Sequence, residues 1–313
     1  MIRTYIDLAS YYLRSRVLGR RLPFLCSFKL TYRCNLKCEG CPFHQRQDSG
    51  GDIPYEKALS VLRLLRRRGN RVVIFEGGEP AMYSDRERML ADLVREAKRM
   101  FLCVGATTNG TLGLDIPTDV LWVSVDGLRQ THNRLRCDSF DRVVENIRAS
   151  KHPYLLAHVT LNRQNAGELT ELIPFLCGLE TIKGVTCQFH YPYDGSGDEL
   201  TLSPADRERA VETLVRLKSK GYPVFNSVPA LREHARFPHR HCLEFLLDNV
   251  NPDGTISQGC YLRSRQGTVE CDLCGFTPNT EATLAYRGRP ASLAAGYRIF
   301  LAGLARSRRA GGR

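Results

Sequence analysis

Short apolar runs and amphipathic stretches alternate along most of this chain. Six apolar runs predict β-strands at 24–30, 72–75, 102–106, 121–125, 155–161 and 185–190. Four stretches between them repeat apolar residues with the helical period, at 55–68, 85–100, 140–149 and 168–177. Strands that alternate with helices predict βαβ units around a parallel sheet. Because six strands are too few for a closed eight-stranded barrel, we expect an open α/β fold.

Other stretches lie outside this alternation. Residues 2–18 and 290–309 read as amphipathic helices, and the apolar face of the second contains Leu293, Tyr297, Phe300, Leu301 and Leu304. A charged helix at 204–220 precedes a short strand-like run at 222–225. We therefore divide the chain into a basic N-terminal helix (1–23), a core domain (24–200), a connecting helix and strand (201–240), a cysteine-rich segment (241–280) and a basic C-terminal tail (281–313).

The composition is that of a folded protein kept in a reducing compartment. The 313 residues are 42% hydrophobic and 25% charged, which fits one large domain or a domain with a small appendage. Charge interrupts the first residues too early for a signal peptide, and no run approaches the roughly 20 apolar residues of a membrane span. We expect a cytoplasmic protein whose twelve cysteines include metal ligands rather than disulfides.

Most of the net charge of +12 belongs to the two ends of the chain. Residues 1–21 contain five arginines and one aspartate, and residues 286–313 contain seven arginines and no acidic residue. The nearly neutral middle shows no long basic groove, so a nucleic-acid substrate is not expected. The basic helices at the ends either cap the domain or lie on an anionic membrane surface, with Tyr5, Tyr11 and Tyr12 as anchors of the first.

The first candidate for chemistry is a cysteine motif that directly follows the first strand. Cys34, Cys38 and Cys41 have C-x3-C-x2-C spacing. Three thiolates can hold three irons of a four-iron cluster and leave the fourth iron open to a small molecule. The alternative is a zinc site, for which His44 would be the fourth ligand.

Polar or glycine-rich residues also follow the next four strands. Gly77-Gly78-Glu79-Pro80 follows the second strand, and Asn109 lies in the Thr-Thr-Asn-Gly that follows the third. The fourth strand ends with Ser124 and Asp126, and the fifth with Asn162. The carboxyl ends of parallel strands meet at one end of the fold, so we expect these residues to surround one site. The glycines would let the backbone approach a ligand, and Glu79 would accept a hydrogen bond from an ammonium group. Local strand-end hydrogen bonding would explain the polar residues equally well.

Together these motifs resemble those of the radical S-adenosylmethionine (SAM) superfamily. The resemblance implies a partial (β/α)6 TIM-like barrel whose [4Fe-4S] cluster, held by the first three cysteines, receives an electron from ferredoxin or flavodoxin. SAM would then be cleaved to methionine and a 5′-deoxyadenosyl radical that attacks the substrate. One departure is Gly40, which stands where the family usually has an aromatic residue. The residues implied in SAM binding are Phe43, Gly77, Gly78, Glu79, Pro80, Asn109, Ser124, Asp126 and Asn162.

A second cysteine set lies near the C-terminus, at Cys242, Cys260, Cys271 and Cys274. A Pro-Asp-Gly turn at 252–254 predicts a hairpin that brings Cys242 and Cys260 together. Two cysteine pairs suit zinc, whereas the spacing is similar to the twitch or SPASM-like segment of radical SAM enzymes, which implies a second [4Fe-4S] cluster. We expect the other cysteines to be small core residues, namely Cys26, Cys103, Cys137, Cys177 and Cys187.

The sequence leaves the substrate open. The basic amphipathic ends favour a lipid or isoprenoid modified at a membrane surface, and auxiliary clusters favour a peptide; a small molecule also fits the fold. A metal-stabilised binding protein without activity would require broken SAM motifs, which this chain does not have apart from Gly40. Cys187, His190 and Tyr191 follow or end the sixth strand, where they either donate a hydrogen atom to a substrate radical or simply pack.

Overall fold

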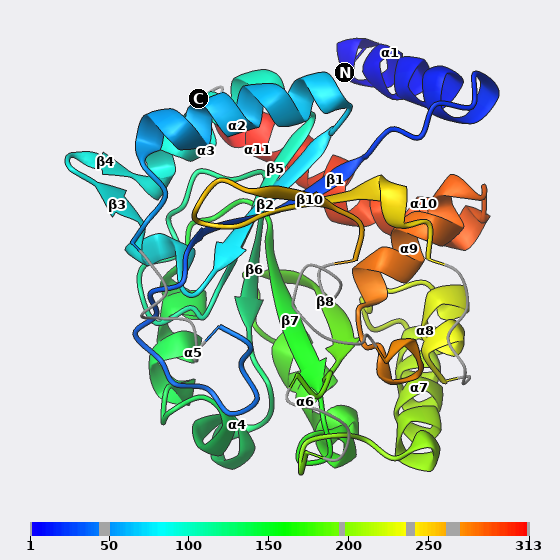
Figure 1. Cartoon of the computed structure of the whole chain (residues 1–313). Helices are drawn as coiled ribbons and strands as arrows, with labels where there is room; N and C mark the ends of the chain where they lie inside the picture. Colours follow the sequence, from blue (N-terminus) through cyan, green and yellow to red (C-terminus); the bar gives the residue numbers. More distant parts are fainter. Residues whose placement is uncertain (1, 44–50, 194–197, 236–241, 261–269, 312–313) are drawn as a thin grey trace.

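The fold is built on one sheet whose strands form an open barrel wall (Figure 1). A computed structural model describes residues 2–43, 51–193, 198–235, 242–260 and 270–311. The sheet has eight strands in the order β10-β9-β1-β2-β5-β6-β7-β8. The six predicted strands are all present and parallel, which confirms the partial barrel: β1 (Leu25–Thr31), β2 (Val72–Gly77), β5 (Cys103–Thr108), β6 (Val120–Ser124), β7 (Leu155–Leu161) and β8 (Ile182–Phe189).

The predicted C-terminal hairpin extends this same sheet rather than forming a separate unit. Strand β9 (Leu247–Val250) pairs in parallel with β1, and β10 (Ile256–Gln258) pairs antiparallel with β9. Asp248 of β9 is fully buried and accepts two hydrogen bonds from Arg68, both of 2.9 Å, so the hairpin is also tied to the helix after β1. The described hairpin of the cysteine-rich segment is thus part of the barrel wall.

Helices cover the outer face of the wall. Helices α2 (Tyr55–Arg68) and α5 (Phe140–Ala149) match their predicted bounds, and α6 (Leu169–Cys177) and α7 (Pro204–Ser219) differ by one residue. Helix α3 (Leu90–Met100) begins later than predicted because β3 (Ser84–Asp85) and β4 (Arg88–Met89) form a small hairpin first. Helix α4 (Arg129–Leu135) was not predicted, since its mostly polar sequence has no apolar period. Short 3-10 turns lie at η3 (Pro80–Met82), η4 (Ala166–Glu168), η5 (Glu244–Leu246) and η7 (Cys271–Leu273).

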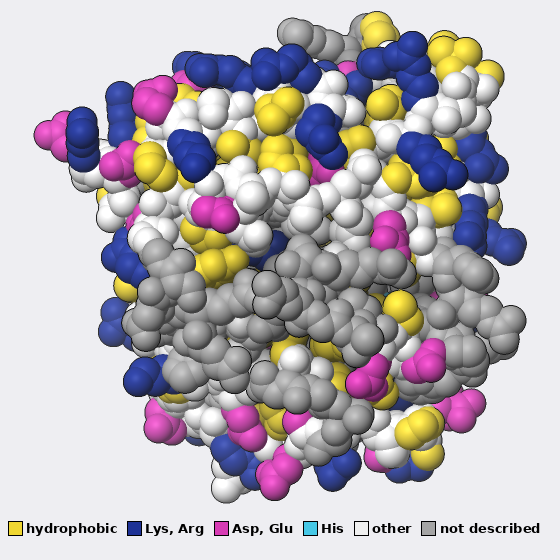
Figure 2. Space-filling view, in the orientation of Figure 1, with side chains coloured by type: hydrophobic (Ala, Val, Ile, Leu, Met, Phe, Trp, Pro, Cys, Tyr) yellow, Lys and Arg dark blue, Asp and Glu magenta, His cyan; other side chains and the backbone are white. Residues whose placement is uncertain are grey.

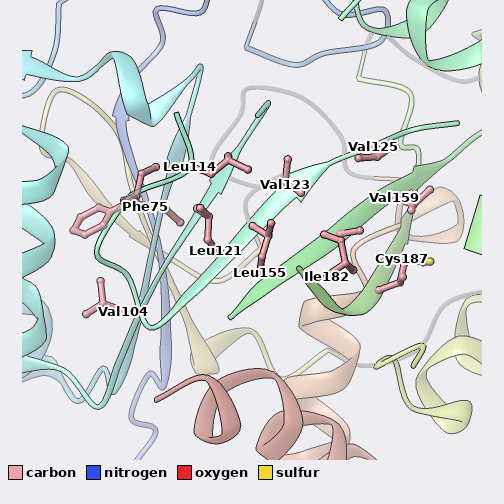
Figure 3. Close-up of a cluster of buried hydrophobic side chains, with 14 of the residues drawn as sticks. Phe75, Val104, Leu114, Leu121, Val123, Val125, Leu155, Val159, Ile182 and Cys187 are labelled. Atoms are coloured by element: carbon pink, nitrogen blue, oxygen red, sulfur yellow. The ribbon is translucent and has the colours of Figure 1, made fainter. Parts of the chain in front are cut away.

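The main core lies between the sheet and these helices. Figure 3 shows part of it, with Phe75, Leu121, Val123 and Leu155 among the apolar side chains of neighbouring strands. A second apolar cluster lies on the opposite, inner face of the strands near their amino ends; it includes Leu25, Val72, Cys103, Val120 and Leu156. Because side chains alternate along each strand, the inner face toward the carboxyl ends presents Lys29, Glu76, His158, Thr160 and Gln188. The barrel interior therefore changes from apolar to polar along its length.

Both terminal segments lie at the amino end of the barrel, away from the cysteine loop. The N-terminal segment consists of α1 (Ile2–Tyr12) and the π-helix η1 (Leu13–Val17), and Asp7 forms ion pairs with Arg66 and Arg71, both of 2.9 Å. The C-terminal segment packs Phe300 on Trp122 and Gly303 beneath Tyr154. The remaining helices are α8 (Val228–Ala235), α9 (Thr277–Tyr286), α10 (Pro290–Gly296), the π-helix η8 (Tyr297–Leu301) and α11 (Ala302–Gly311).

The predicted apolar face of the last helix is divided in the structure. Leu293 and Tyr297 are each 52% exposed, whereas Leu304 is buried. The π-helical turn η8 adds a residue to one turn, so positions before and after it no longer share a face. This helix is therefore a packing element with an exposed outer side.

Candidate active site

The three cysteines of the first motif lie in the loop that follows β1, and all three are partly buried. Burial raises the pKa of Cys38 to about 12, and nearby thiolate charge at Cys41 and Cys34 adds to the rise although Arg136 opposes it. The three side chains therefore lie close enough for their charges to interact. In the described part of the chain no three His, Cys, Asp or Glu side chains already surround a single ion position. In a four-iron cluster each thiolate binds a different iron, so the thiolates need not meet at one ion.

Gly77 and Gly78 hold the cysteine loop against the end of β2. Gly78 N donates to Thr31 O and Glu79 N donates to Arg33 O, both at 2.8 Å. A Cβ at Gly77 would lie 2.2 Å from Thr31 O, and one at Gly78 would lie 2.1 Å from Arg33 O. The missing side chains of both glycines thus make room for the backbone of the cysteine loop, and their contact with a ligand stays a prediction.

Glu79 joins the ends of β2 and β5. Its side chain is fully buried, and it accepts hydrogen bonds from Ala81 N (3.0 Å), Thr108 Oγ1 (2.8 Å) and Asn109 N (2.7 Å). Burial raises the pKa of Glu79 in spite of these donors. A carboxylate has about four acceptor positions, so three donors from the protein leave room for one more, such as an ammonium group.

Asn109 connects the third strand end to the cysteine loop. Its Nδ2 lies 2.8 Å from Asn35 Oδ1 and 3.7 Å from Cys34 Sγ. Pro80 begins the 3-10 turn that follows Glu79. The ring of Phe43 stacks on Tyr32 with 5.9 Å between the centroids. Asn109 is thus the predicted SAM-binding residue whose contact with a motif cysteine the structure shows directly.

The ends of β6 and β7 carry the remaining predicted residues. Ser124 is buried at the last position of β6. Asp126 Oδ1 accepts from Thr160 N at 2.7 Å, and Asn162 Oδ1 accepts from Gln164 N at 2.9 Å in a tight turn. Strand-end hydrogen bonding therefore engages both Asp126 and Asn162, as the alternative interpretation had it.

Arg136 is a residue of this region that the sequence did not reveal. Its Nε donates to Asp126 Oδ2 at 2.6 Å, and its Nη1 lies 4.0 Å from Cys38 Sγ. Burial alone would lower the pKa of Arg136, but Asp126 and Cys38 more than reverse this, so the guanidinium stays charged. The neighbouring Cys137 was predicted to be a core residue; it is exposed, and its sulfur accepts a hydrogen bond from Lys37 N at 3.3 Å. No periodic pattern marks either residue, because they follow a short polar helix.

The structure explains why glycine occupies position 40. Gly40 has a φ of +67°, which disfavours residues with a side chain. A Cβ there would lie 2.8 Å from His190 Cε1 and 2.7 Å from Leu200 Cδ1. His190 is held in turn by Asp198 at 2.5 Å. An aromatic residue at position 40 would require these two side chains to move.

The second cysteine set lies between the two edges of the open sheet. Cys260 follows edge strand β10, and Gly275 O, next to Cys274, accepts a hydrogen bond from Phe189 N of edge strand β8 at 3.0 Å. Burial raises the pKa of Cys274 to about 12, and charge at the other three cysteines of the set contributes. Cys274 is therefore near enough to the other three for their charges to interact, although among the described residues no three metal-binding side chains surround a single ion position. His44, the alternative zinc ligand of the first set, lies outside the described residues.

Among the candidates for hydrogen-atom transfer, Cys187 faces the wrong side of the sheet. It is fully buried and lies with Val159 and Ile182 in the core between the sheet and the helices (Figure 3). Tyr191 is buried, and its hydroxyl accepts from Glu270 N at 3.2 Å, close to the second cysteine set. Packing explains Cys187 fully.

Comparison with known proteins agrees with this arrangement. The family model of the Radical SAM superfamily matches residues 28–176. A probable GTP 3′,8-cyclase of Methanocella arvoryzae is 30% identical over 217 residues, covering 63% of this chain and 68% of the relative. Fe-coproporphyrin III synthase of Methanosarcina barkeri is 27% identical, covering 63% of this chain and 53% of the relative. The chain belongs to the radical SAM superfamily, whose enzymes use a [4Fe-4S] cluster and SAM.

A solved structure extends the similarity of fold to nearly the whole chain. Streptococcus suis SuiB bound to the precursor peptide SuiA has a TM-score of 0.63 and 15% sequence identity, and the match covers 93% of this chain and 70% of that one. The match therefore includes the region around the second cysteine set as well as the barrel. At this level of identity the likeness concerns the fold.

Proposed function

We propose that this protein is a radical SAM enzyme whose Cys34, Cys38 and Cys41 hold the SAM-binding [4Fe-4S] cluster. The main observation is the placement of the three cysteines in one loop that Gly77, Gly78 and the Glu79 backbone fasten to the carboxyl end of the barrel. When bound and reduced, the cluster supplies the electron that cleaves SAM to methionine and a 5′-deoxyadenosyl radical. A ferredoxin or flavodoxin is the proposed source of that electron.

The surrounding residues have separate roles in this proposal. Glu79 accepts a hydrogen bond from the SAM ammonium with its remaining acceptor position, and Asn109 orients the ligand beside Cys34. Asp126 fixes Arg136, which places a positive charge beside the anionic cysteine loop. Phe43, Pro80, Ser124 and Asn162 complete the proposed SAM site. These residues position the ligand and keep water away from it.

We propose that Cys242, Cys260, Cys271 and Cys274 hold a second [4Fe-4S] cluster. Their placement at the opening between β10 and β8 supports a centre at the side of the reaction chamber. A zinc site with the same four thiolates is the alternative.

Metal analysis after anaerobic reconstitution tests both centres. We expect about eight irons per wild-type chain and about four in the Cys34/Cys38/Cys41→Ala variant. The wild type, but not the variant, should form 5′-deoxyadenosine from SAM and dithionite. Iron that is unchanged in the variant would refute the first site. About four irons in the wild type and none in the variant, with zinc present in both, would show that the second site binds zinc.

We propose a peptide as the substrate class, because the barrel interior is polar near the cysteine loop. Near the carboxyl ends of the strands the inner face presents Lys29, Glu76, His158 and Gln188, which can hydrogen-bond to a polar chain. The solved neighbour SuiB is described as bound to a precursor peptide. The basic amphipathic ends that favoured a lipid lie at the opposite end of the barrel, so they do not support delivery of a lipid to the cysteine loop. Deoxyadenosine formation that rises with peptides and not with isoprenoid lipids would support this assignment.

We further propose that the amino end of the barrel attaches to anionic membranes. Figure 2 shows Lys and Arg side chains interspersed with hydrophobic ones along the top, where Figure 1 places α1 and α2. Among the described residues, the exposed large hydrophobic side chains are concentrated in the terminal segments: Tyr5, Ile6, Tyr12, Leu13, Val17, Leu18, Leu293 and Tyr297. No helix in the described ranges is long and apolar enough to cross a membrane.

Vesicle sedimentation tests this attachment. Binding should require anionic lipid and should weaken at high salt, since exposed Arg16, Arg20 and Arg21 lie beside the apolar side chains. An Ile6/Val17→Ser variant should bind less, and a Met89→Ser variant, which removes an exposed apolar side chain from β4, should bind like the wild type. The proposal would be refuted if the wild type and both variants sedimented with vesicles equally, or if none of these proteins sedimented with them.

A further inference from the structure

Arg207 is a buried arginine on α7, whose other buried residues are all apolar. It lies in the first turns of α7, its residue exposure is 1%, and its guanidinium carbon lies 4.9 Å from the centroid of the Phe189 ring. A guanidinium is costly to bury unless its donors and its charge are both compensated. The position of Arg207 therefore calls for a specific partner.

The guanidinium binds the loop that carries two cysteines of the second set. Its Nη1 donates to Cys274 O at 2.8 Å and its Nη2 donates to Leu273 O at 3.1 Å. His234 Nδ1 lies 3.3 Å from the same Cys274 oxygen. Gly275 is pressed against β8, because a Cβ there would lie 1.8 Å from Phe189 O. The Cys271–Cys274 turn is thus fixed from α7, α8 and β8 together.

The charge of Arg207 has the sign that this site requires. Four thiolates outweigh the positive charge of an iron–sulfur core, so the centre is anionic, and each reduction adds a further negative charge. Charge at Cys274 is near enough to interact with the guanidinium. A fixed cation in a poorly solvated surrounding stabilises the reduced centre more than the oxidised one.

We infer that Arg207 is a positioning residue for the second cysteine site and that its charge raises the reduction potential of the cluster held there. The inference rests on the proposed second [4Fe-4S] cluster and adds the residue that raises its reduction potential. Arg207 holds the cysteine turn through two carbonyl groups and compensates the negative charge of the centre.

The test uses the Cys34/Cys38/Cys41→Ala chain, in which only the second centre can form. Arg207→Gln removes the charge and keeps an amide donor for the carbonyls, and Arg207→Lys is the matched control that keeps the charge. The readouts are iron per chain and the midpoint potential from redox titration followed by electron paramagnetic resonance. We expect reduction to become on the order of tenfold less favourable in Arg207→Gln, a fall of about 59 mV for a one-electron couple. The lysine variant should remain near the parent.

The outcomes separate this inference from the proposal beneath it. A parent without iron would remove the second cluster and this inference with it. A parent and a glutamine variant with equal iron and equal potential would refute the role of Arg207 and leave the second cluster in place. If Arg207→Gln does not fold, Arg207→Lys decides the effect of charge: the parent's iron and potential would support it, and the parent's iron with a potential lower by about 59 mV would refute it.

Discussion

The ion pair between Asp126 and Arg136 gives the sharpest prediction about stability. The side chains are 9% and 15% exposed, and the pair lies between the end of β6 and the cysteine loop. Asp126→Asn would leave Arg136 charged and buried while still accepting a hydrogen bond from Thr160 N. Removing one partner of a buried pair typically costs 3–5 kcal/mol, and we expect about 3 kcal/mol here because that hydrogen bond survives.

Urea unfolding of the reduced apoprotein under anaerobic conditions measures this cost. With a slope of about 3 kcal/mol per M for a chain of this size, the midpoint should fall by about 1 M. Asp141→Asn is the matched control, because the pair of Asp141 with Arg129 is 62% and 63% exposed and should contribute no more than about 1 kcal/mol. Adding Arg136→Met to Asp126→Asn should restore part of the lost stability, since no buried charge remains unpaired. Equal midpoints for the Asp126 and Asp141 variants would contradict the reasoning.

Three further predictions follow from contacts elsewhere. Gly78→Ala should reduce the iron content by about four per chain, because its Cβ would lie 2.1 Å from Arg33 O. Gly113→Ala is the control and should keep its iron, because open space surrounds Gly113. Equal iron contents in the two variants would refute this prediction. Burial lowers the pKa of His152 to about 4, below the ordinary 6.5, so the unfolded chain takes up its proton first as the pH falls. The contribution of His152 to the free energy of unfolding is complete above pH 6.5 and should be lower by about 2 kcal/mol at pH 5. The free energy of unfolding of His152→Gln should therefore depend less on pH than that of the wild type, and an unchanged dependence would argue against this role. Cys187→Ser should lower stability by about 1–3 kcal/mol without changing deoxyadenosine formation per iron, and a selective loss of activity would return Cys187 to the reaction.

The strands were predictable because parallel strands buried on both faces read as short apolar runs. Helices α2 and α5 were predictable for a similar reason, since each presents one apolar face to the sheet. Helix α4 has few apolar positions, so it has no apolar period that could be detected. The hairpin β9–β10 was predicted from its turn, but its pairing with β1 joins residues more than 200 positions apart, and local patterns carry no information about such a partner.

The site was predictable where chemistry imposes a spacing. The cysteines and the glycines after β2 could be found in the sequence because they are closely spaced and follow strands. Arg136 and Arg207 were not predictable, because an arginine inside or after a charged helix is usually solvated, and only the fold shows that these two are buried. The contact of Gly77 and Gly78 with the cysteine loop was not predictable either, since the backbone that they admit belongs to a loop more than 40 residues earlier.

The position of the second cysteine set has a consequence for how the protein tolerates oxygen. The set joins Cys260, beside β10, to the turn that rests on β8, and these are the two edges of the sheet. Exposed strand edges invite pairing with other chains. A centre at these cysteines would link the end of β10 to the turn that rests on β8. Its oxidative loss would leave β10 as the uncovered edge, because β8 keeps its hydrogen bonds to residues 223–226. Damage by air would then appear as self-association of the protein before it appeared as unfolding.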